Sequence, residues 1–245
     1  MALDLFEESK EDIDNRKKAT SYEKAYQECP WGMSSRAREG TTRGKVTLNS
    51  GNTSLLFEEA SGQQLRIWDC ALILSYYMDH AFPSLFWKDK TVLELGCGIG
   101  LPGLTAAKLG AKQVYLTDLS GLEWMEHHRK LNHLEKNQVK IEKLDWGHPH
   151  SFNGTSCDIL LCSDLFYGDA KSAQLLLNTI LTVGKKTAYL LMVHETRWQG
   201  HRNEMVLSEF QDAVEKCGYK KIPIEKKALH PVYQREFIDV VLWTK

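Results

Sequence analysis

The stretch from Thr91 to Asp118 constrains the fold of this chain more than any other part of the sequence. It opens with a largely apolar run, Thr91–Leu95, that does not alternate and ends at a glycine, which predicts a buried strand. The glycines that follow allow positive φ and let a ligand approach the backbone. A helix to about Leu109 and a second strand, Gln113–Thr117, come next, and Asp118 ends that strand. A strand, glycine turn, helix and strand with a terminal acid predict a cradle for a nucleoside.

Two kinds of nucleoside fit this cradle. Gly98, Gly100 and Gly103 satisfy the pattern G-x-G-x-x-G, and Asp118 follows at the distance of about 20 residues that a dinucleotide site requires. Glu94, however, stands inside the first strand in the pattern E-x-G-x-G. A buried carboxylate there needs hydrogen-bond partners, which the amides of the loop or the ammonium group of a ligand supply. This feature favours S-adenosylmethionine (SAM).

An NAD-dependent oxidoreductase of the short-chain type is the competing interpretation, because Tyr167 and Lys171 form a Y-x-x-x-K pair. In those enzymes the tyrosine lies well over a hundred residues after the glycine motif. Here Gly96 and Tyr167 are much closer together, so the spacing argues against hydride transfer.

Composition excludes several other classes of function. A net charge of −1 gives no field that would attract nucleic acid. The six cysteines contain no C-x-x-C pair, which argues against a zinc site and against a disulfide framework. The acidic N-terminal stretch is no signal peptide, and no apolar run reaches the ~20 residues of a membrane span. We therefore expect a cytoplasmic protein, or one shared with the nucleus, that binds no membrane.

The chain divides into two regions. Residues 1–50 are polar and rich in charge and predict a flexible or partly helical N-terminal extension, and residues 51–245 are expected to form the SAM-binding domain. At the start of that domain, Thr53–Phe57 and Gln64–Trp68 predict a β-hairpin, and Asp69 predicts the N-cap of a helix to about Phe82. His127, His128 and His133 lack a carboxylate or cysteine to complete a metal site, which favours solvated histidines.

Strand and helix patterns continue to alternate after Asp118. Three further strands are predicted at Val139–Leu144, Asp158–Ser163 and Thr187–Val193. Tyr219–Ile224 and Phe237–Trp243 then follow with no helix between them, so they should pair antiparallel. The predicted fold is a three-layer αβα Rossmann-like sandwich. It has a seven-stranded, mostly parallel sheet, an antiparallel C-terminal strand and an N-terminal extension with a β-hairpin.

Four motifs recur together in one group of enzymes. They are Ile67-Trp68-Asp69, the glycine turn from Glu94 to Gly103, Leu144-Asp145-Trp146-Gly147 and Ser163-Asp164-Leu165-Phe166-Tyr167. With them, the chain from about Leu55 to Lys245 resembles the seven-β-strand SAM-dependent methyltransferases, and more narrowly the methyltransferase-like 21 family of protein-lysine methyltransferases. The last motif is similar to the Asp-x-x-Tyr signature of that family.

The resemblance implies cofactor-binding roles. Glu94, Gly96 and Gly98 would line the methionine end of SAM, and Asp118 would hold the ribose. Trp146 would flank the adenine and Trp68 would touch the cofactor from the N-terminal side, although core packing explains either tryptophan as well. Ser163 would contact the methionine moiety through its backbone, where the family often has a small apolar residue.

Methyl transfer from the sulfonium of SAM to an amine is an in-line displacement. It requires alignment of the methyl donor and the acceptor and exclusion of water, and it needs no metal. A lysine amine has a pKa of ~10.4 in water and must be neutral to attack. We expect the Asp164 carboxylate to accept hydrogen bonds from the amine and orient its lone pair, and the ring of Tyr167 to wall the lysine channel. The structural alternative is that Asp164 caps the next helix.

Other functions remain open at this stage. The methyltransferase-like 23 group shares a similar Ser-Asp-x-Phe pattern, which allows protein-arginine methylation, although the paired glutamates usual for that reaction are missing here. A non-catalytic SAM-binding interaction protein is the alternative outside enzymes. The resemblance implies a folded protein substrate, such as a chaperone or a translation factor, with S-adenosylhomocysteine as product. Nothing demands more than a monomer.

Overall fold

The computed structural model describes residues 27–28, 42–48, 53–60, 62–83, 85–154, 156–166, 170–184, 186–196, 201–231 and 233–245. Tyr167 and most of the predicted N-terminal extension, with its helical segment, lie outside the described residues. Two sheets are present in the described part: a small one of three strands and a large one of seven.

The large sheet has the strand order β6-β5-β4-β7-β8-β10-β9. Its strands are β4 (Thr91–Leu95), β5 (Gln113–Asp118), β6 (Val139–Lys143), β7 (Ile159–Ser163), β8 (Tyr189–Glu195), β9 (Lys220–Pro223) and β10 (Ile238–Thr244). Only β10 runs antiparallel to its neighbours β8 and β9, and all other pairings are parallel. The seven-stranded Rossmann-like sheet with an antiparallel C-terminal strand is therefore confirmed.

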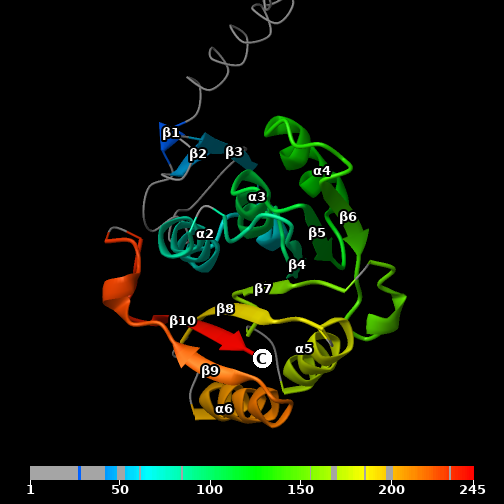
Figure 1. The fold of residues 1–245 in the computed structure, drawn as a ribbon, viewed down its shortest axis with the longest axis vertical. Helices are drawn as coiled ribbons and strands as arrows, with labels where there is room; N and C mark the ends of the chain where they lie inside the picture. The colour runs from blue at the N-terminus through cyan, green and yellow to red at the C-terminus, as the bar shows by residue number, and fades with distance from the viewer. Residues whose placement is uncertain are drawn as a thin grey trace, which may run out of the picture.

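Helices cover both faces of this sheet, as Figure 1 shows. They are α2 (Asp69–Ala81), α3 (Leu101–Lys108), α4 (Leu122–Leu131), α5 (Ala170–Val183) and α6 (His201–Lys216). Successive residues of a buried strand point to opposite faces. Val92 and Ile159, which pair in register, lie in the core shared with α2 and α3, whereas Leu93 and Leu160 lie in the core shared with α5 and α6. The three-layer sandwich thus has two hydrophobic cores, one on each side of the sheet.

The order of the strands reverses at the centre of the sheet. From β4 the chain moves outward to β5 and β6, and it then returns to form β7 on the other side of β4. The carboxyl ends of β4 and β7 therefore diverge into different loops. Such a reversal is where open α/β sheets bind ligands.

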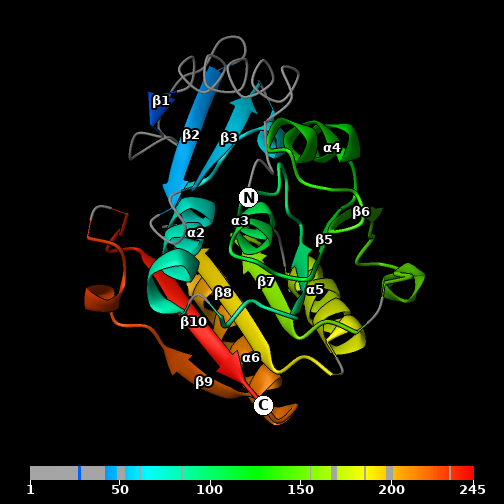
Figure 2. The same cartoon turned by 45° about the horizontal axis from the view of Figure 1, so that its top comes forward.

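The small sheet consists of β1 (Gln27–Glu28), β2 (Thr42–Leu48) and β3 (Thr53–Glu59), and Figure 2 shows it at the top, beside α4. A hairpin is present, but its strands are β2 and β3. The predicted partner Gln64–Trp68 is wrong, because residues 63–65 form the 3₁₀ turn η2 (Gln63–Leu65) instead. The Ile67 amide donates to the Glu59 carboxylate at 2.9 Å, so it is satisfied without a strand partner.

Polar side chains of α4 and of its C-cap residue Asn132 attach the small sheet to the rest of the domain. Asn132 accepts from the Leu56 amide and donates to the Leu56 carbonyl, each at 2.7 Å. The His128 ring is fully buried and lies 3.0 Å from the Glu58 backbone, so the expectation of a solvated histidine is wrong at this position. His127 pairs with the Glu58 carboxylate at 3.0 Å. Among the described residues, no cluster of histidine, cysteine and acid side chains is arranged to hold a metal.

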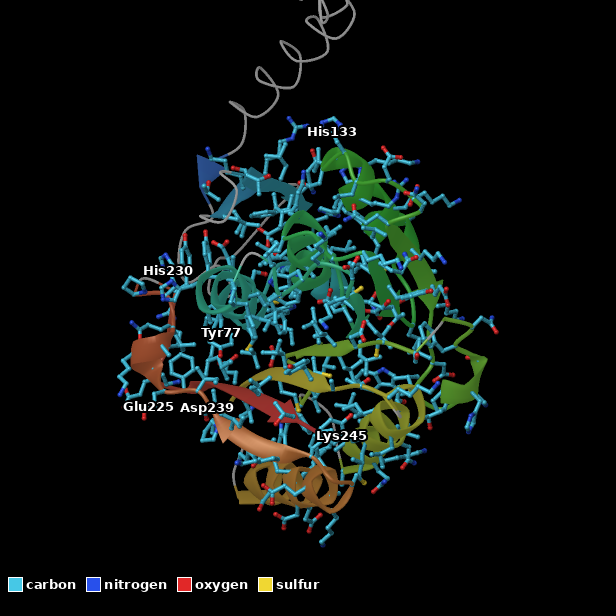
Figure 3. All side chains as sticks on the ribbon, viewed as in Figure 1. Tyr77, His133, Glu225, His230, Asp239 and Lys245 are labelled. Carbon is cyan, nitrogen blue, oxygen red and sulfur yellow. The ribbon has the colours of Figure 1, made fainter. Side chains whose placement is uncertain are left out.

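The connection between β9 and β10 contains η4 (Lys226–Ala228) and packs against α2; Figure 3 labels Glu225 and His230 on it. The rings of Tyr76 and Tyr233 stack with centroids 3.8 Å apart. Arg235 Nε lies 3.5 Å from Asp69 Oδ2 at the start of α2. Trp68 rather than Asp69 is the N-cap of this helix. No helix in the described part combines the length and the hydropathy needed to cross a bilayer.

Candidate active site

A cavity of about 330 Å³ opens where the strand order reverses. Four segments that are distant in the sequence line it: the approach to α2, the glycine turn after β4, the end of β5 and the residues after β7. The predicted site residues among its lining are Trp68, Glu94, Gly96, Gly98, Asp118, Ser163 and Asp164. The structure therefore brings together most of the residues that the motifs single out.

The glycine turn is built tightly against the rest of the site. Gly96 has a φ of 54°, which disfavours other residues. A Cβ at this position would lie 2.7 Å from Leu165 and 3.3 Å from the Trp146 ring. Trp146 is not part of the cavity lining itself but packs behind Gly96. Its predicted contact with an adenine stays a prediction.

Asp118 closes the turn from the side of β5. Its Oδ2 accepts from the Gly98 amide at 2.9 Å and its Oδ1 from the Leu119 amide at 2.7 Å. Burial raises the pKa of the Asp118 carboxyl, and these amide hydrogen bonds oppose the rise. The carboxylate lines the cavity at the carboxyl end of β5, which is where a site of this kind binds the hydroxyl groups of a ribose.

Glu94 is 1% exposed and joins β4 to α3. Its Oε2 accepts from the Gly103 amide in the first turn of α3 at 2.8 Å, a position where a carboxylate is favoured by the helix dipole. Burial raises the pKa of Glu94 well above its ordinary value, the Gly103 hydrogen bond lowers it, and the charge of Asp118 raises it. Because Glu94 and Asp118 lie on the same side of the cavity, a cationic ligand beside them would stabilise their charged forms.

Cys97 also lines the cavity, and its surroundings disfavour the thiolate form. Burial holds the pKa of its thiol well above the ordinary value, and the charges of Glu94 and Asp118 add to this effect. The thiolate is the reactive form of cysteine. The site is therefore not built for covalent catalysis through sulfur.

Ser163 and Asp164 follow β7 on the other side of the cavity. Asp164 is 8% exposed, and its backbone has a φ of 56°, which is uncommon for any residue except glycine. Its amide donates to the Val193 carbonyl at 2.8 Å, which ties it to β8. The next helix, α5, begins only at Ala170, so Asp164 does not occupy its N-cap position. Strained backbone of this kind is concentrated at functional sites.

Sequence reasoning did not select Gln64, Arg66 or Phe166 as site residues, and the structure places all of them in the cavity lining. Gln64 Nε2 lies 3.4 Å from Asp118 Oδ1, and Gln64 Oε1 accepts from the Ser120 hydroxyl at 2.8 Å. Two sequence signals exist for this group: the isolated cation Arg66 directly before Ile67-Trp68-Asp69, and the place of Phe166 in the motif that begins at Ser163.

Comparison with known proteins identifies the family of this chain. A family profile described as lysine methyltransferase matches residues 50–215. The chain belongs to this family. The resemblance drawn from the sequence motifs is confirmed.

Two relatives found by sequence comparison are named for different acceptor residues. The protein N-lysine methyltransferase METTL21A of Mus musculus is 30% identical over 158 residues, which cover 62% of this chain and 70% of that protein. The histone-arginine methyltransferase METTL23 of Xenopus laevis is 36% identical over 106 residues, which cover 41% of this chain and 44% of that protein. The chain spans about half the length of the relatives named methyltransferase-like 23, between 40% and 50%.

The fold also occurs among solved structures. The 16S rRNA N2 G1207 methyltransferase of T. thermophilus, solved in complex with AdoMet and guanosine, has a TM-score of 0.55 and 16% identity. The superposition covers 86% of this chain and 52% of that chain. At this identity, the likeness concerns the fold alone.

The cavity of this family member fits SAM in chemistry. Glu94, Asp118 and Asp164 present carboxylates, and a sulfonium nucleoside with an ammonium group carries two positive charges. The Ser163 hydroxyl is buried and has no hydrogen-bond partner in the described part of the chain. Because buried polar atoms nearly always have partners, this orphan hydroxyl indicates that a polar ligand completes the site.

Proposed function

We propose that this protein is a SAM-dependent methyltransferase that modifies a lysine side chain of a folded protein. The observation that carries the proposal is the cavity at the reversal of the strand order, which has the glycine turn with Glu94 and Asp118 on one side and Asp164 on the other. Membership of the lysine methyltransferase family supports the same conclusion.

The two sides of the cavity have separate tasks in this proposal. Asp118 binds the ribose, and Gly96 and Gly98 let the methionine end approach the backbone. Glu94 faces the methionine ammonium while it holds the first turn of α3. Trp68, Trp146 and the Ser163 backbone complete the contacts. SAM supplies an electrophilic methyl group when bound, and no metal takes part.

Asp164 acts on the acceptor. A lysine amine is protonated in water, and burial disfavours its ammonium form. The Asp164 carboxylate, held at the cavity by its left-handed backbone and its bond to β8, accepts hydrogen bonds from the amine and orients its lone pair toward the donor. Tyr167, which lies outside the described residues, would form a wall of the lysine channel and contact the cationic product.

Arginine methylation is the second candidate, because the Xenopus laevis relative carries that name. Segment 163–166 offers one carboxylate, Asp164, where arginine enzymes usually use paired glutamates. Lysine is therefore the favoured acceptor. We further propose that the protein acts as a monomer on a protein substrate in the cytoplasm, with a share in the nucleus.

Labelling identifies both substrate and acceptor. The purified protein is incubated with methyl-labelled SAM and a cell lysate, the labelled protein is identified, and its hydrolysate is analysed for methyllysine and methylarginine. Methyllysine is the expected product. Methylarginine instead of methyllysine would support the second candidate, arginine methylation. No transfer together with SAM binding in calorimetry would indicate a non-catalytic SAM-binding protein. Thermal stabilisation by NAD in place of SAM would overturn the proposal.

A further inference from the structure

Arg66 lies between η2 and α2 and lines the cavity. Its Nε is buried without a hydrogen-bond partner, and its guanidinium takes part in none of the hydrogen bonds or ion pairs among the described residues. The other arginines whose side chains are described lie differently: Arg43, Arg129 and Arg235 each lie within 3.5 Å of a carboxylate oxygen. Arg66 is therefore an unusual cation, directed into a cavity and left there without a counter-charge.

Two of the three acids in the described lining accept hydrogen bonds from backbone amides. Glu94 accepts from the Gly103 amide, and Asp118 accepts from the Gly98 and Leu119 amides. Backbone amides of the glycine turn, of α3 and of the residue after β5 thus take the place that an arginine would otherwise fill. The guanidinium of Arg66 remains available for an anionic group that is not part of the chain.

Charge complementarity identifies that group. Among the described residues, the lining contains three carboxylates and one cation, Arg66. SAM carries the reverse pattern, with a sulfonium and an ammonium group as cations and a single carboxylate as anion. The ligand carboxylate would be repelled by Glu94, Asp118 and Asp164, so Arg66 is the group in the lining that can compensate it. Guanidinium and carboxylate form two parallel hydrogen bonds, which adds specific geometry to the charge.

We propose that Arg66 binds the carboxylate of the methionine moiety of SAM. This inference rests on the proposed function, since it assumes that SAM occupies the cavity. Arg66 is then a positioning residue. A cofactor carboxylate held by Arg66, between η2 and α2, determines how far the methyl group reaches toward Asp164.

The test measures binding by calorimetry with two ligands. One is S-adenosylhomocysteine, and the other is its decarboxylated analogue, which keeps the ammonium group but lacks the carboxylate. We expect Arg66→Gln to lower the affinity for S-adenosylhomocysteine by about 10- to 100-fold, as for the loss of a charge-assisted hydrogen bond. The affinity of Arg66→Gln for the decarboxylated analogue should differ by less than about twofold from that of the unmodified protein. The affinity of Arg66→Lys for S-adenosylhomocysteine should lie between those of the unmodified protein and Arg66→Gln.

Arg43→Gln is the matched control. It removes the same charge from a side chain that is 50% exposed, pairs with Glu58 and does not line the cavity. Both ligands should bind this variant as they bind the unmodified protein. Thermal unfolding of each variant verifies that the fold is intact.

The outcomes separate the inference from the function on which it rests. If the unmodified protein binds S-adenosylhomocysteine and Arg66→Gln weakens both ligands equally, or neither, the carboxylate contact is wrong while the methyltransferase function stands. If Arg66→Gln instead raises only the KM for the protein substrate, Arg66 faces the acceptor and the inference is also overturned. If the unmodified protein binds neither SAM nor S-adenosylhomocysteine, the proposed function itself fails.

Discussion

The two sides of the cavity are built in different ways. On the donor side, neighbours along the chain satisfy each other: Glu94 binds the Gly103 amide and Asp118 binds the Gly98 amide, all within the first β-α-β unit. On the acceptor side, Asp164 depends on β8 for its amide bond and adopts a strained backbone conformation. The comparison teaches that local backbone amides hold the two acids of the donor side, whereas a neighbouring strand of the large sheet holds Asp164 on the acceptor side.

The largest effect is expected on the acceptor side. Asp164→Asn removes the charge that orients the amine, so we expect the methylation rate to fall by about 100-fold or more. Calorimetry should give an affinity for S-adenosylhomocysteine within about twofold of the unmodified protein, because the donor side is unchanged. Asp212→Asn, an exposed acid on α6, is the control and should change neither quantity. A loss of cofactor affinity equal to the loss of rate would contradict the separation of the two sides.

A second substitution tests how closely the donor side is packed. A Cβ at Gly103 would lie 2.3 Å from Leu116 and 2.7 Å from Glu94 Oε2. We expect Gly103→Ala to lower the free energy of unfolding by about 2 to 3 kcal/mol, as for other overpacked cores. Denaturant titration provides the measurement.

Gly110→Ala is the comparison for this variant, because its Cβ would meet nothing within 4 Å although its φ is 101°. Backbone strain alone should cost about 1 kcal/mol there. Equal losses in both variants would mean that close packing around Gly103 contributes nothing.

A third substitution addresses ligand binding on the donor side. Asp118→Asn keeps one oxygen for the Gly98 amide but removes the charge and one acceptor. We expect the affinity for S-adenosylhomocysteine to fall about 10-fold, with little effect on the rate at saturating SAM. An unchanged affinity with a slower reaction would place Asp118 on the acceptor side.

The smallest effect concerns pH and a histidine beside Asp164. His194 in β8 is 4% exposed, and burial lowers its pKa, while the charges of Asp239 and Asp164 raise it and those of Lys221 and Lys226 lower it. Because the folded pKa is lower than the unfolded one, the unfolded state binds the proton first as pH falls. The buried ring therefore costs stability from about pH 6.5 downward, by at most about 1.4 kcal/mol per pH unit.

His194→Gln should flatten this part of the stability curve, measured by denaturant titration between pH 7 and pH 5. His128 is buried as well, and burial lowers its pKa, so the unmodified protein and His194→Gln share its contribution and their difference isolates His194. A curve with the same slope in both proteins would show that His194 does not titrate in this range.

The difference between the two sides also explains what could be predicted from the sequence. The donor side consists of contiguous chemistry, so the strand, the glycine turn and Asp118 were recognisable from spacing alone. The hairpin partner was not, because Thr42–Leu48 carries Arg43 and Lys45 within a charge-rich stretch, while Gln64–Trp68 has the more apolar composition. The position of Arg66 in the cavity depends on how three distant segments pack, and no local pattern reports this.

The wall of the cavity formed by residues 64–68 is supported from outside the large sheet. Glu59 holds the Ile67 amide at 2.9 Å, and the Ala60 amide donates to the Leu65 carbonyl at 3.0 Å. A shortened protein that began at β4 would retain the glycine motif and Asp164. It would nevertheless lose the scaffold beneath Arg66 and Trp68, and with it one face of the nucleoside pocket.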